Sequence, residues 1–354
     1  MSLTKEYKCP LCGGTLAFDA ATQKLVCPYC DHVMEVDDFS EQLEKESSEQ
    51  QETETKIEEA EDLKEGFVSY ECESCGGEII TQSVDGSFRC PYCGNNIVAP
   101  KQFSGMIRPH YIIPFAKEKE EAKTALENHI KGHWFLPKDF AFRNKIDSIT
   151  GVYVPFWLYD CDLEGNMDFH ATRVTTWQDS NYRYTKTDHY QLDRSGALHF
   201  HRLPVDGASR FDDALMKSIE PFQFDHIIDF DLGYLAGFGA QRYDVGKEVN
   251  IPEIEEGTKK EMANALRNSV IGYHTCIASS EAIKLQHIDA EYALLPVWML
   301  SSTYQGKIYT FAMNGQTGKF VGNLPMDKRK YWSIFASVAL VSAAIIYFLC
   351  RGIL

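Results

Sequence analysis

Eight cysteines in the first 93 residues constrain this chain more than any other feature. They form two sets with the same spacing, C-x2-C-x14-C-x2-C. A Cys-x-x-Cys turn brings two thiolates to one side of a tight loop, and two such turns on adjacent hairpins complete the tetrahedron that Zn²⁺ forms with four sulfurs at about 2.3 Å. The sequence therefore predicts two small β zinc ribbons with closed, structural sites. The expected ligands are Cys9, Cys12, Cys27 and Cys30 in the first ribbon, and Cys72, Cys75, Cys90 and Cys93 in the second.

The two ribbons are copies of one unit. A shift of 63 residues matches the motif CPYC at 27–30 with CPYC at 90–93. Gly13 follows a cysteine pair where the turn favours a left-handed residue, and Asp31 stands at the equivalent place after the next pair. A thioredoxin-like dithiol needs one motif at a helix start rather than four matched motifs. We expect two structural Zn²⁺ ions, with rubredoxin-like iron as the alternative.

Acidic residues concentrate between the two ribbons. The whole chain has 35 Lys+Arg against 51 Asp+Glu, a net charge of -16, and residues 37–65 alone hold thirteen acids and three lysines. Such a segment buries too little apolar surface to offset the entropy lost on ordering. We interpret it as a solvated acidic linker, and a docking site for a basic partner is the alternative.

Neither ribbon, at residues 1–36 and 66–100, has the basic stripe that contact with phosphates requires. In the second ribbon Arg89 is the only basic residue against four acids. A four-thiolate zinc site adds about two negative charges. Protein contact is therefore favoured over nucleic-acid contact.

Residues 101–327 are predicted to form a central α+β domain. Apolar spacing predicts helices over 118–131 and 253–273, and a run that is apolar on both faces predicts a strand at 152–158. We expect two further strands, joined by turns, at 292–304 and 307–321. The motif VPFWL at 154–158 resembles LPVWM at 295–299. Two related units and a chance match are both open interpretations of this similarity.

The chain ends in an apolar segment. Residues 332–350 contain no charged side chain, and at about 1.5 Å per residue they cover a hydrocarbon core of about 30 Å. We therefore predict that residues 328–354 form a basic collar, one transmembrane helix and a short tail.

The flanking charges predict the orientation of this helix. Lys328, Arg329 and Lys330 precede it and Arg351 follows, and no apolar run for a signal peptide precedes Cys9. We expect a single-pass protein of the cell membrane with its N-terminus in the cytoplasm. In that reducing compartment paired cysteines bind metal rather than form disulfides.

Several motifs resemble sites for chemistry, but none supports the prediction of an enzyme. The motif NGQTGK at 314–319 resembles a phosphate loop, yet Met313 occupies the first glycine position and Phe320 follows the lysine, so we interpret it as a hairpin turn. Two histidine pairs have metal-ligand spacing without a third ligand, three aspartates form an acidic cluster, and two cysteines are expected to be buried thiols. These residues are His129 and His133, His199 and His201, Asp225, Asp229 and Asp231, and Cys161 and Cys276.

With the paired ribbons, four further motifs carry a resemblance: GVYVPFW at 151–157, YLAGF at 234–238, LPVW at 295–298 and NGQTGK at 314–319. On these the chain resembles the bacterial TFIIB-type zinc-ribbon membrane proteins, which are often mislabelled primosomal or replication-restart helicases. It has no Walker A loop, so the helicase label finds no support. The family is similar to the membrane partner encoded beside SPFH-domain and phage-shock-protein-A-like proteins. The resemblance implies an envelope-stress scaffold with such partners and the eight cysteines as zinc ligands.

These observations predict a non-enzymatic, membrane-anchored double zinc-ribbon adaptor or scaffold. Its ribbons, on an acidic tether, would recruit cytosolic proteins, and we expect no small-molecule substrate and no nucleic-acid partner. The alternative is a membrane-tethered, nucleic-acid-binding zinc-ribbon regulator. A hydrolase in the central domain would require a deep polar pocket near Asp225 or His199.

Overall fold

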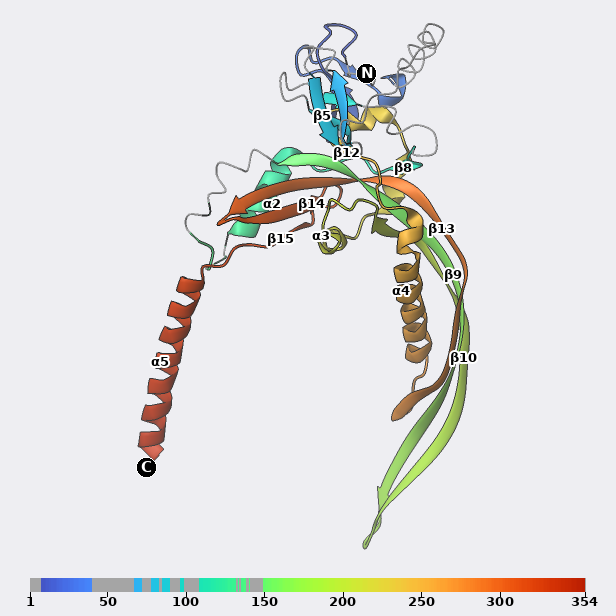
Figure 1. The fold of residues 1–354 in the computed structure, drawn as a ribbon. Helices are drawn as coiled ribbons and strands as arrows, with labels where there is room; N and C mark the ends of the chain where they lie inside the picture. Colours follow the sequence, from blue (N-terminus) through green and yellow to red (C-terminus); the bar gives the residue numbers. More distant parts are fainter. Residues whose placement is uncertain are drawn as a thin grey trace.

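The computed structural model describes residues 8–39, 67–71, 78–82, 85–89, 96–98, 108–131, 133, 135–137, 140 and 149–353. An N-terminal ribbon, a mostly β central domain and one C-terminal apolar helix follow one another along the chain (Figure 1). The second cysteine set and most of the predicted acidic linker lie outside the described residues, so the second zinc ribbon stays a prediction. The four cysteines concerned are Cys72, Cys75, Cys90 and Cys93.

Three very long antiparallel strands form the main body. They are β9 (Thr150–Gln178), β10 (Arg183–Asp206) and β13 (Thr275–Tyr304), and β9 lies between the other two. At about 3.3 Å per residue, the 29 residues of β9 extend on the order of 95 Å. Figure 1 shows these strands as one curved blade that runs from the centre of the molecule to a distant hairpin tip.

Helix α4 (Lys247–Asn268) lies on the concave side of the blade (Figure 1). Met262 and Leu266 are buried there against the sheet, as predicted. Gly165 allows this close approach, because a Cβ at that position would lie 3.0 Å from the Met262 side chain. The helix begins before the predicted 253 and ends before 273, since the chain turns through Gly272 at a φ of 86° to enter β13.

The middle of the sheet is buried on both faces, which explains the unbroken apolar run predicted at 152–158. One face packs against α2 (Lys119–Ile130), the helix predicted at 118–131, and includes Tyr153 and Trp298. The other face packs around α3 (Asp213–Ser218) and includes Phe156 and Leu295. Alternate residues of each strand therefore enter two different cores.

One order of elements occurs twice. β8 (Tyr111–Ile112), α2, β9 and β10 are followed by β12 (Gly239–Gln241), α4, β13 and β14 (Lys307–Asn314). β8 pairs in parallel with β13, and β12 pairs in parallel with β9. Val154 lies directly opposite Leu295, its partner in the proposed sequence repeat. An internal duplication would produce this arrangement, and the duplication itself stays a prediction.

Shorter elements extend the sheet at its margins. β6 (Asp85–Arg89) and β7 (Asn96–Val98), from the predicted second ribbon, join it through β12, while β4 (Phe67–Glu71) pairs with β5 (Glu78–Gln82) separately. β11 (Ile228–Asp229) pairs with β8, and β15 (Phe320–Gly322) pairs with β14. Two 3₁₀ turns, Phe224–His226 and Leu232–Leu235, connect α3 to β12.

The NGQTGK motif is a hairpin turn between β14 and β15, as predicted. Gly318 has a φ of 80°, and its N–H donates to the Asn314 carbonyl. The fully buried Asn314 side chain accepts hydrogen bonds from the backbone of Gln316 and Thr317. Its amide nitrogen donates to the carbonyls of Ile219 and Pro221. The turn thereby fixes the loop that follows α3.

We predict that Asn314→Ala lowers the free energy of unfolding by about 2–4 kcal/mol, because four backbone groups at buried or part-buried positions lose their partner. Asn323→Ala removes an exposed amide from the same region and should change stability by less than about 0.5 kcal/mol. Denaturant unfolding followed by tryptophan fluorescence compares the two. Equal stabilities would contradict this role for Asn314.

Candidate metal centre

The first cysteine set lies on a small antiparallel ribbon of three strands: β1 (Ala17–Asp19), β2 (Lys24–Val26) and β3 (Val33–Met34). One Cys-x-x-Cys turn precedes β1 and the other joins β2 to β3. Gly13 and Asp31 have φ values of 72° and 55°, the left-handed conformations predicted after each cysteine pair. In both turns the N–H of that residue donates to the first cysteine carbonyl.

The four sulfurs converge on one point. The ligand atoms of Cys9, Cys12, Cys27 and Cys30 all lie within 4.8 Å of one another. The Sγ atoms of Cys9 and Cys30 are 3.6 Å apart, and those of Cys12 and Cys27 are 3.5 Å apart. Four sulfurs at about 2.3 Å from a tetrahedral zinc would be separated by about 3.8 Å. The cluster therefore fits a four-thiolate Zn²⁺ site.

The electrostatics of the cluster also favour a cation. Burial acts to raise the pKa of the Cys27 thiol, but backbone N–H groups of Tyr29 and Cys30 outweigh it and lower that pKa to about 7. The His32 N–H acts to lower the pKa of Cys30, but the neighbouring sulfurs outweigh it and raise that pKa to about 12. Four thiolates so close together repel one another, and a divalent cation offsets this repulsion.

The first ribbon packs directly on the central domain. The Phe18 N–H donates to the Ala236 carbonyl over 3.0 Å, and the Gln23 side chain donates to the Phe115 carbonyl over 2.9 Å. The Phe18 ring meets that of Tyr234 edge-on at 5.1 Å. Gly233 is required at this contact, because a Cβ there would lie 2.6 Å from Val36. The first ribbon is thus packed against the central domain and is not an independent module.

The other groups predicted as candidate sites make structural contacts. His129 bonds the Gly322 carbonyl, and the exposed His199 and His201 pair separately with Asp162 and Asp160. Asp231 caps a 3₁₀ turn at Gly233, and Cys161 is buried whereas Cys276 is half-buried. Over the part of the chain that the structure describes, the four-cysteine cluster is the one group placed to hold a metal.

Two carboxylates with raised pKa values, the buried Asp206 and the half-buried Glu220, were not identified from the sequence. Burial raises the pKa of Asp206 to about 6 and that of Glu220 to about 7. The Lys217 ammonium partly offsets both shifts and pairs with Glu253 of α4. The Glu220 backbone carbonyl accepts a hydrogen bond from the side chain of Lys319, which follows the Asn314 turn. We therefore assign a structural role to Asp206, Lys217 and Glu220.

We predict that Cys27→Ser removes about one zinc ion per chain, because a serine hydroxyl remains protonated where a thiolate is needed. Cys276→Ser makes the same change outside the cluster and should leave the zinc content unchanged. Metal analysis of both purified variants tests the assignment. A Cys27→Ser protein with the full zinc content would contradict it.

Comparisons with known proteins agree with this site. The family model described as TFIIB zinc-binding matches residues 7–48, which include all four cysteines of the first set. The "Uncharacterized protein YdjG" of Bacillus subtilis (strain 168) is 32% identical over 333 residues, which cover 94% of each chain. No solved structure matches the chain. The chain therefore belongs to the family that includes YdjG and carries a TFIIB-type zinc ribbon at its N-terminus.

Proposed function

We propose that this protein is a non-enzymatic adaptor that holds cytosolic proteins at the inner face of the cell membrane. Helix α5 (Lys328–Ile353) carries the proposal. Its segment Lys328–Tyr347 is long and apolar enough to cross a bilayer, with a mean hydropathy of 1.4, and none of it is buried against the protein. Figure 1 shows α5 extending away from the rest of the chain.

Beyond its first turn this helix is exposed within the part of the chain that the structure describes, and an exposed apolar helix of this length needs an apolar surrounding. Side chains around the helix, including Phe335, Leu340 and Ile346, are more than half exposed. The basic residues Lys328, Arg329 and Lys330 lie at its N-terminal end, which supports a cytoplasmic position for the ribbon and the central domain.

The blade supplies the proposed surface for a protein partner. Among the described strands β10 (Arg183–Asp206) pairs with β9 alone, so no other described strand covers its outer edge. Open strand edges bind extended segments of other chains through backbone hydrogen bonds. The resemblance to partners of SPFH-domain and phage-shock-protein-A-like proteins makes these two classes the candidates.

The tip of the blade adds exposed aromatic side chains. Trp177 and Tyr184 stack at 5.4 Å and are 51% and 40% exposed, and Tyr182 is 67% exposed. Asp179 fixes the turn, because it accepts hydrogen bonds from the backbone of Asn181 and Tyr182 and from the Tyr184 hydroxyl. Rigid, exposed Trp and Tyr residues are frequent hot spots of protein interfaces.

The zinc in this proposal has a structural role. All four ligands of the first site come from the protein, so no coordination position is open for a substrate. The described surface of the first ribbon pairs Lys24 with Glu35 and offers no basic stripe for nucleic acid.

We predict that Leu340→Arg with Val341→Arg releases the protein from the membrane, since each arginine at the centre of a span costs about 3 kcal/mol. The control replaces two exposed apolar residues elsewhere, Val249 and Ile271, with arginine. Carbonate extraction of cell membranes should retain the wild type and the control in the pellet. Carbonate release of the wild type would contradict the anchor.

We also predict that a photocrosslinking residue at Tyr182 captures a protein in living cells, because the tip is rigid and exposed. The adduct should be lost when Trp177 and Tyr184 are replaced with alanine, since the stacked pair would form the contact. A crosslinker at the exposed Glu256 of α4 is the control and should not give that adduct. Adducts with nucleic acid alone, or equal protein adducts at Tyr182 and Glu256, would contradict the proposed adaptor function.

A further inference from the structure

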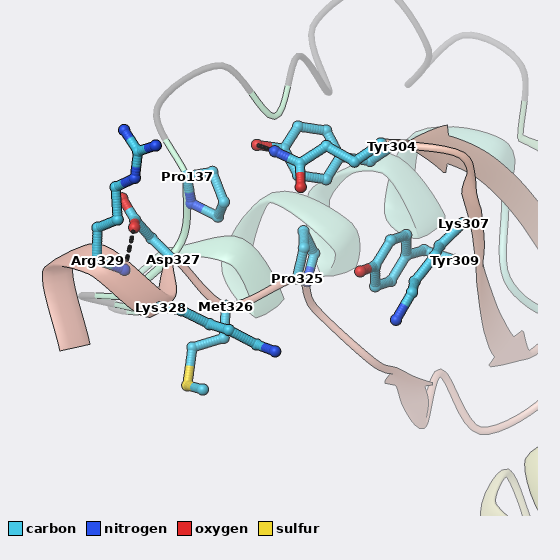
Figure 2. Close-up of a pocket in the computed structure, with 10 residues that line it drawn as sticks. Pro137, Tyr304, Lys307, Tyr309, Pro325, Met326, Asp327, Lys328 and Arg329 are labelled. Carbon is cyan, nitrogen blue, oxygen red and sulfur yellow. Dashed lines mark hydrogen bonds between the residues drawn. The ribbon is translucent and has the colours of Figure 1, made fainter. Parts of the chain in front are cut away.

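A cavity of about 590 Å³ lies where the central domain meets the start of α5. The hairpin between β13 and β14 provides one wall, with Tyr304, Lys307 and Tyr309, and the first turn of α5 provides another, with Lys328 and Arg329. Figure 2 shows the amino groups of Lys307 and Lys328 extending to the same side of the cavity from these two walls.

The cavity is cationic. Among the described residues that line the cavity, Asp327 is the one acidic residue, and its carboxylate is already used to cap α5, where it accepts from the backbone N–H groups of Arg329 and Lys330. Over the described part of the chain, neither Lys307 nor Lys328 forms a salt bridge. Two lysine ammonium groups are therefore available to an anion.

The first turn of α5 is held in place at this cavity. The Asp327 N–H donates to the Phe135 carbonyl over 2.7 Å, and the Tyr331 ring packs edge-on against Phe135 at 5.6 Å. The Tyr304 and Tyr309 rings pack against Phe140. Both walls of the cavity therefore contact described residues of one segment, Phe135 and Phe140.

We propose that this cavity binds the phosphate of an anionic phospholipid headgroup, with Lys307 and Lys328 as its ligands. Resting on the membrane anchor proposed above, the site would lie at headgroup depth, since the hydrophobic part of α5 begins one turn later at Tyr331. Basic pockets at the cytoplasmic end of membrane helices bind anionic lipids in this way. Tyrosine side chains with an apolar ring and a polar hydroxyl suit the same interface.

Lipid binding to the purified full-length protein in detergent tests the proposal. Native mass spectrometry titrates phosphatidylglycerol and, separately, phosphatidylcholine. Each charge-assisted bond to phosphate contributes about 1.5 kcal/mol or more, so Lys307→Gln and Lys328→Gln should each weaken phosphatidylglycerol binding about tenfold. Phosphatidylcholine carries a choline cation that offsets the charge of its phosphate, so it should bind more weakly to the wild type and lose less affinity on either substitution.

The control is Lys330→Gln, which removes the same charge from the same basic collar but does not line the cavity. If the lipid is held only by the general attraction between the basic collar and its negative charge, Lys330 on the helix should contribute at least as much to phosphatidylglycerol binding as Lys307 in the hairpin. A site at the cavity predicts that the Kd of the Lys330→Gln variant for phosphatidylglycerol stays within about twofold of the wild-type value.

The proposal would be overturned if Lys307→Gln and Lys330→Gln lost the same affinity for phosphatidylglycerol, or if neither Lys307→Gln nor Lys328→Gln lost any. Inorganic phosphate that displaces the lipid at concentrations near the lipid's own Kd would show a site for free phosphate instead. Because binding is measured in detergent, failure here is separate from failure of the anchor, which carbonate extraction reports.

Discussion

The antiparallel pairing of β9 with β13 is the interaction on which the rest of the structure depends. It runs from Thr150 opposite Met299 to Thr172 opposite Thr275, and nearly every other described element attaches to one of these two strands or to a face they form. Strands buried on both faces need a cover on each side, and α2, α3 and α4 provide it. Beyond the region that these helices cover, the blade of β9, β10 and β13 continues to the distant hairpin tip (Figure 1).

The first zinc ribbon shares one core with this sheet. A unit of about 30 residues has too small a core to be stable alone, and it needs metal and a surface to pack on. Phe18 reaches Tyr234 and Phe238, and Phe238 in turn stacks on Phe115 at 4.1 Å. Zinc, ribbon and central domain therefore stabilise one another, and the apolar helix α5 extends away from the same body.

The sequence predicted features that depend on neighbouring residues. The four ligands of the first site, the left-handed Gly13 and Asp31, helix α2 and the turn at Asn314 all follow from local spacing and conformational preference. The apolar run at 152–158 also predicted a strand buried on two faces. The full length of β9 was not visible, because past Tyr159 its apolar residues alternate with charged ones that face solvent on a long, curved sheet.

Contacts between residues far apart in the chain could not be predicted from the sequence, because they depend on the folded arrangement of the elements. Phe18 and Val36 look like the core of a ribbon in isolation, and their partners near residues 233–238 are some 200 positions away. The cationic cavity combines Lys307 with Lys328, which only the folding of the β13–β14 hairpin against the start of α5 brings together. The pairing of β6 with β12 is equally non-local, and so the predicted second ribbon could not be connected to the sheet in advance.

Hydrogen exchange on the full-length protein, with zinc and after chelation, tests most directly whether ribbon and central domain form one body. The account predicts that chelation removes protection from the ribbon and also from the docking segment at 233–241, while the paired centre of β9 and β13 stays protected. Loss confined to residues 8–39 would contradict the account, because the ribbon would then be an independent module.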